Sequence, residues 1–94
     1  MVVIALLTID IHIPHAQSLK DKRMVIRRVK DRLRSKFNVA VSEVDHQELW
    51  QRSQLSAVTV GSDDDYVQQT LRLALEEAER SVPECVVQGN IEIV

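Results

Sequence analysis

Basic side chains crowd into one segment of this 94-residue chain, in a spacing that could bind a polyanion. Residues 18–36 hold nine of the twelve Lys and Arg residues against two aspartates, an excess of about +7, whereas the rest of the chain sums to about −9. Five of the nine are spaced 3, 4, 3 and 4 residues apart, so an α-helix would place them in one row. We call this row the basic ridge; it consists of Lys20, Arg23, Arg27, Lys30 and Arg34. Each like-charged neighbour pair costs about 0.2–0.5 kcal/mol in an isolated helix, so negative charge from elsewhere should offset the ridge.

Two sources could supply the negative charge that offsets the basic ridge. The first is a second helix packed alongside, but on a helical wheel only Glu77 and one or two aspartates of its first turn would flank the shared core. The second is an external polyanion, for which structured RNA or a ribosome component held by phosphate contacts is the best candidate. The sequence therefore leaves two interpretations of the ridge, a solvated or internally paired face and an RNA-contacting face.

A second group of chemically capable residues lies in the segment from Asp45 to Trp50. Asp45 and His46 could form an acid–base pair or half of a metal site. The structural alternative is that Asp45 and His46 cap a strand end and that Trp50 plugs the edge of the core. No nucleophile or second set of ligands accompanies them, so we assign no catalytic residue, metal or cofactor, and the sequence favours a protein that is not an enzyme.

Hydrophobic periodicity predicts the elements that carry these residues. Alternating apolar residues at odd positions from Val3 to Ile13 indicate a strand with one buried face. Ser18 is expected to cap a helix whose apolar stripe has Lys22 at its edge. Further strands are predicted at 38–44, 55–60 and 85–94, a loop or a single turn at 45–53, a bulge or bend at Gly89–Asn90, and a second helix capped by Ser62.

The order β-α-β-β-α-β predicts an α+β, ferredoxin-like fold, in which a four-stranded antiparallel sheet carries two helices on one face. All of residues 1–94 are expected to form a single domain. The other sheet face is then uncovered, and Val2, Ile4 and Leu6 would lie on it as candidates for a homodimer or partner interface. A protein–protein adaptor using this face is the alternative function.

The composition of the chain excludes or disfavours several classes of protein. The apolar start of the chain is interrupted by Thr8, Asp10 and His12, so neither a signal peptide nor a membrane span is expected. The single Cys85 fits a reducing cytosol. The first and third predicted strands carry no aromatic residues, which excludes base stacking of the RNA-recognition-motif type.

The chain resembles the YlxP-like family of small uncharacterised bacterial proteins. The likeness covers nearly the whole length and rests on residues 18–23 (SLKDKR), 36–41 (KFNVAV) and 43–52 (EVDHQELWQR). The resemblance implies a cytosolic protein of ferredoxin-like fold, and genes of the family often lie among those for translation initiation and ribosome maturation. The family has no established activity, so the resemblance assigns no role to any residue.

Overall fold

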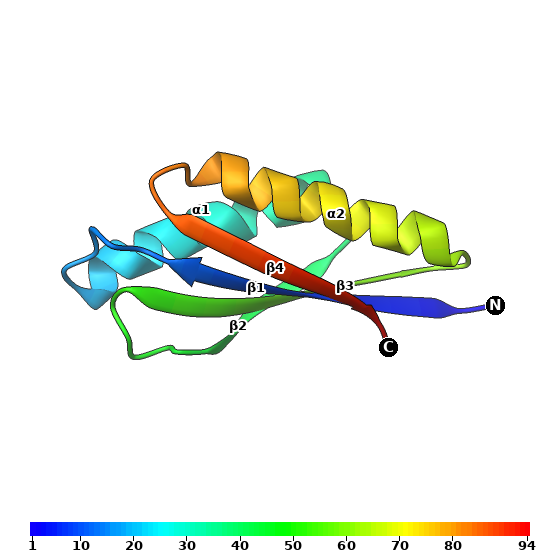
Figure 1. Ribbon diagram of the computed structural model, residues 1–94, viewed down its shortest axis with the longest axis horizontal. Helices are drawn as coiled ribbons and strands as arrows, with labels where there is room; N and C mark the ends of the chain where they lie inside the picture. Colours follow the sequence, from blue (N-terminus) through cyan, green and yellow to red (C-terminus); the bar gives the residue numbers. More distant parts are fainter.

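The computed structural model describes all residues from 1 to 94 and contains six elements. In chain order they are β1 (Val3–His12), α1 (Leu19–Lys36), β2 (Ala40–Asp45), β3 (Arg52–Gly61), α2 (Asp64–Ser81) and β4 (Val86–Ile93). The strands form one antiparallel sheet in the order β2-β3-β1-β4, and both helices lie on the same face of it (Figure 1). The predicted ferredoxin-like fold is therefore confirmed.

The hydrophobic core lies between the helices and the sheet. Odd-numbered residues of β1 point into it, and Ala5, Leu7 and Ile9 are fully buried. The stripes of the two helices meet them from above, among them Val29 of α1 and Leu71 of α2, both also fully buried. Burial of large aliphatic side chains stabilises a fold by about 1.5–3 kcal/mol each, so this layer is the main reason that α1 is held with one face inward.

Local hydrogen bonds fix where the two helices begin. Ser18 Oγ accepts from the Asp21 backbone N at 3.0 Å, as predicted, and the Asp21 carboxylate accepts in return from the Gln17 backbone N. The second helix is capped by Asp63, whose carboxylate accepts from Tyr66 N at 3.0 Å, and the prediction of Ser62 is wrong by one residue. Both residue types are good N-caps, so the sequence alone does not separate them.

The strand boundaries differ from the predicted ones on the second half of the sheet. β2 begins two residues later than predicted, and β3 already begins at Arg52, inside the predicted loop. Arg52 and Ser53 belong to β3 although their polarity suggested a loop, because a strand with one face uncovered tolerates polar residues.

The sheet has one irregularity in its pairing, and it lies in a different strand from the one predicted. A register shift occurs in β2 between Glu43 and Asp45, whereas Gly89 and Asn90 pair in unbroken register with β1. The predicted bulge at Gly89 is therefore wrong. A Cβ at Gly89 would lie 2.7 Å from Cδ1 of Leu75, so glycine lets α2 pack closely on β4.

Neither helix is both long and apolar enough to span a lipid bilayer.

Candidate nucleic-acid interface

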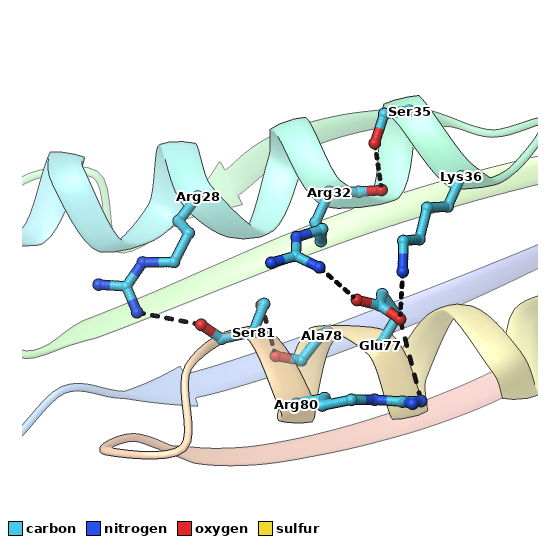
Figure 2. Close-up of polar contacts among 8 residues, drawn as sticks. All are labelled: Arg28, Arg32, Ser35, Lys36, Glu77, Ala78, Arg80 and Ser81. Atoms are coloured by element: carbon cyan, nitrogen blue, oxygen red, sulfur yellow. Dashed lines mark hydrogen bonds and ion pairs between the residues drawn. The ribbon is translucent and has the colours of Figure 1, made fainter.

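The two flanks of α1 differ in how their charges are paired. On the flank that faces α2, Arg28 pairs with Glu84 at 3.1 Å, and Arg32 and Lys36 pair with Glu77 at 3.2 and 3.3 Å. Figure 2 shows Arg28, Arg32 and Lys36 reaching from α1 toward α2, with Arg28 donating to the Ser81 backbone carbonyl and the Glu77 carboxylate between Arg32 and Lys36. The Glu77 side chain is only 6% exposed, so water screens its two pairs less than the exposed Arg28–Glu84 pair.

The opposite flank carries the basic ridge, and none of its five residues makes an ion pair. Lys20, Arg23 and Arg27 are exposed and have no hydrogen-bond partner in the protein, and Lys30 is half-buried without one. Arg34 alone has a partner, because its Nη2 donates to the Val41 backbone carbonyl at 2.9 Å. The positive charge of this flank is thus not neutralised within the molecule.

A groove runs between this flank and the β2 side of the sheet. Its volume is about 400 Å³, and four ridge residues contribute to its lining. The nine lining residues are Lys22, Arg23, Ile26, Arg27, Lys30, Asp31, Arg34, Glu43 and Gln47. Five cationic and two anionic side chains meet there, and we call this feature the basic groove.

Lys22 was predicted at the edge of the apolar stripe, and the structure buries it. Its side chain is 2% exposed, its ammonium pairs with Glu43 at 2.9 Å, and it also donates to the His46 carbonyl. Glu43 accepts in addition from Ser53 Oγ at 2.6 Å. A buried charge needs such partners, and these come from β2, β3 and the loop between them, which the local sequence around Lys22 cannot reveal.

The loop after β2 does not form the predicted plug. Trp50 is 52% exposed, so the interpretation that it closes the edge of the core is wrong. Asp45 does cap the strand end, since its Oδ1 accepts from the His46 backbone N at 2.7 Å. His46 adopts φ 64°, in the left-handed region, and the Lys22 ammonium holds its carbonyl.

The Asp45–His46 pair gives little support to acid–base or metal chemistry. The imidazole Nδ1 lies 3.8 Å from Asp45 Oδ1, beyond hydrogen-bond distance. No group of three or more His, Cys, Asp or Glu side chains converges in a way that could hold a metal ion. The arrangement shapes the turn, and no third residue completes a site.

The uncovered sheet face has an apolar end. Val2 is 74% exposed, Ile4 is 42% exposed, and Leu6 is half-buried. Val60 on the neighbouring strand is 52% exposed, and a shallow, mainly apolar groove of about 440 Å³ lies beside Ile4. This end of the sheet is the one place where large aliphatic side chains from β1 and β3 face solvent together.

Near the start of β4, two groups have shifted pKa values. A hydrogen bond from its own backbone N–H lowers the pKa of Glu84, and the Arg28 guanidinium adds to the effect. Burial raises the pKa of the Cys85 thiol to about 11, with the charge of Glu84 contributing. Cys85 is therefore a neutral thiol near pH 7 and a poor nucleophile.

Fold and surface together define a small ferredoxin-like α+β protein with an unpaired basic flank on its first helix. The chain belongs to a family described as protein of unknown function (DUF503), whose model matches residues 4–89. It is 45% identical over 47 residues to the uncharacterised protein YlxP of Bacillus subtilis (strain 168), a stretch that covers 50% of this chain and 51% of that protein. The matched stretch thus spans about half the length of this relative. The expected likeness to the YlxP-like family is confirmed.

Solved structures share the fold at low sequence identity. A de novo designed protein with ferredoxin fold, LFR1 1, matches with a TM-score of 0.61 at 12% identity, covering 96% of this chain and 85% of that one. A C-terminal segment of the aIF2 alpha subunit from Pyrococcus abyssi matches with a TM-score of 0.57 at 17% identity, covering 96% of this chain and 49% of that one. SnoaB, a cofactor-independent oxygenase from Streptomyces nogalater, matches with a TM-score of 0.57 at 11% identity, covering 96% of this chain and 91% of that one. Proteins this distant establish the fold only.

Proposed function

We propose that this protein is a cytoplasmic RNA-binding module that contacts structured RNA, such as ribosomal RNA, through the basic ridge. The observation that carries the proposal is the contrast between the two flanks of α1. Arg28, Arg32 and Lys36 each have a carboxylate partner, whereas the ridge has none. Phosphates would supply the missing counter-charge and release condensed ions as they bind.

The difference between the paired and the unpaired flank of α1 bears on function, because a carboxylate is available near the unpaired flank as well. Asp31 lies on the exposed side of α1 and lines the basic groove, yet it pairs with no ridge residue. The self-repulsion of the ridge therefore persists in the free protein, and an anionic ligand relieves it. Contacts of this kind position RNA and carry little sequence information.

A paired charge reversal tests the proposal. Arg23→Glu/Arg27→Glu alters two ridge residues that have no partner in the protein. Arg52→Glu/Arg72→Glu is the matched control, because both residues are exposed and lie outside the groove on β3 and α2. We expect the ridge variant to lose affinity for a ribosomal RNA fragment by about 100-fold at low salt, and the control by far less, measured by fluorescence anisotropy. Equal losses in the two variants would refute the ridge as the contact surface.

A second candidate function is self-association or adaptor binding through the apolar end of the open sheet face. It is favoured by the joint exposure of Val2, Ile4 and Val60 beside an apolar groove. Sedimentation of the Ile4→Glu variant is the test, because a charge in the centre of a buried contact would dissociate it. A parent protein that sediments as a monomer, or a variant that keeps the parent's oligomeric state, would argue against this function.

A further inference from the structure

The basic groove is a recess with residues on two walls, whereas general attraction to RNA requires only a charged surface. Four ridge residues line it on the α1 side, and Glu43 and Gln47 line it from β2 and the following loop. Its volume of about 400 Å³ lies within the range of small-ligand pockets, about 300–1,000 Å³. It is therefore a recess of ligand size and not a flat contact surface.

The charges within the groove are arranged so that the ridge residues stay available. Glu43 is the acidic residue opposite the ridge, and its carboxylate is already held by the Lys22 ammonium and by Ser53 Oγ. Lys22 and Glu43 therefore cancel one another beneath the groove. The remaining charged groups are four ridge residues and Asp31, so the groove is strongly positive.

The backbone carbonyls beside the groove are already occupied, which disfavours a peptide and does not hinder a phosphate ligand. Along β2, which is an edge strand, the Val41 carbonyl accepts from Arg34 at 2.9 Å and the Glu43 carbonyl accepts from Gln47 at 3.5 Å. An extended peptide that paired with this edge would need those carbonyls as acceptors for its own N–H groups. The phosphate oxygens of a phosphodiester need no acceptor, so they do not compete for those carbonyls and can accept from the four ridge residues that line the groove.

From these observations we infer that the basic groove seats the sugar–phosphate backbone of an unpaired RNA segment, such as a loop, bulge or free end. The inference rests on the proposed function and narrows it to single-stranded RNA. A single strand can enter a groove and follow its charges, whereas the phosphates of a rigid double helix would meet only the rim. Arg34 is positioned in advance by its bond to the Val41 carbonyl, which lowers the entropy cost of binding.

The experiment compares an unstructured RNA of about 12 nucleotides with a fully paired duplex carrying the same number of phosphates, at low salt and by fluorescence anisotropy. Gln47→Glu places one negative charge on the groove wall that faces the ridge, and Gln88→Glu places the same charge on β4 outside the groove. We expect the single strand to bind more tightly than the duplex. Gln47→Glu should weaken single-strand binding by about five- to tenfold and Gln88→Glu by less than about twofold, as Coulomb energies near a surface suggest.

The outcomes separate this inference from the proposed function. Equal or tighter binding of the duplex, or equal effects of the two Gln→Glu variants, would overturn the groove as a single-strand site while leaving the ridge as an RNA contact. Absence of binding to either RNA at low salt would overturn both. Tighter binding of the single strand, with a selective loss in Gln47→Glu, supports the inference.

Discussion

Replacing Lys22 tests how the buried ion pair supports both the fold and the groove. Lys22→Met keeps the aliphatic stem in place but removes an ammonium that pairs with Glu43 and donates to the His46 carbonyl. Hydrogen bonds to a charged group contribute about 1.5–3 kcal/mol each, and removal of one partner from a fully buried pair costs about 3–5 kcal/mol. The Glu43 side chain is 21% exposed, so water would partly compensate for the lost partner.

We therefore expect Lys22→Met to lower the free energy of unfolding by about 2–3 kcal/mol, which corresponds to a fall in Tm of about 10–20 °C for a domain of this size. Urea unfolding followed by circular dichroism measures the effect. Lys20→Met is the matched control, because Lys20 is exposed and unpaired, and its loss should stay within about 0.5 kcal/mol. Equal stability of the two variants would refute the reasoning that the Lys22 pair is a net stabilising contact.

Three further predictions concern α2, β4 and the segment that joins them. Glu77→Gln should reduce stability by about 1–3 kcal/mol in urea unfolding, because Arg32 and Lys36 lose a shared carboxylate; unchanged stability would show that the helix pair does not depend on it. Gly89→Val should also cost about 1–3 kcal/mol through its clash with Leu75, and an equally stable variant would contradict the close packing of α2 on β4. Because the pKa of Cys85 is raised from 9.0 to about 11, its alkylation at pH 8 should be about 100-fold slower than in the urea-unfolded chain. The rate in the folded protein should keep rising by about tenfold per pH unit up to about pH 11, whereas the rate in the unfolded chain should level off above about pH 9. Equal rates in the folded and unfolded states would contradict the burial of the thiol.

The fold was predictable because its periodicities are strong. Odd-numbered apolar residues of β1 and the stripe of α1 each specify one buried face, and their order in the chain leaves few topologies. The boundaries of β2 and β3 were less predictable. A strand with one face in water can carry Arg52 and Gln54 without losing its pairing, so polarity there does not distinguish a strand from a loop.

The pairing of α1 was predictable in outline but not in detail. The helical wheel placed Glu77 beside α1, and the structure pairs it with Arg32 and Lys36. The burial of Lys22 depends on Glu43 and Ser53, which are distant in sequence, so no local pattern predicts it. The exposure of Trp50 was predicted wrongly because its apolar ring suggested a place in the core, whereas the loop that carries it turns outward.

The salt dependence of RNA binding tests the central claim most directly. If about four phosphates neutralise the ridge, the slope of log affinity against log salt concentration should be about −3 to −4. Arg27→Gln, which removes one unpaired charge from the groove, should make that slope shallower by about one, whereas Arg72→Gln should leave it unchanged. A slope near zero for the parent protein, or the same slope for all three proteins, would contradict the account.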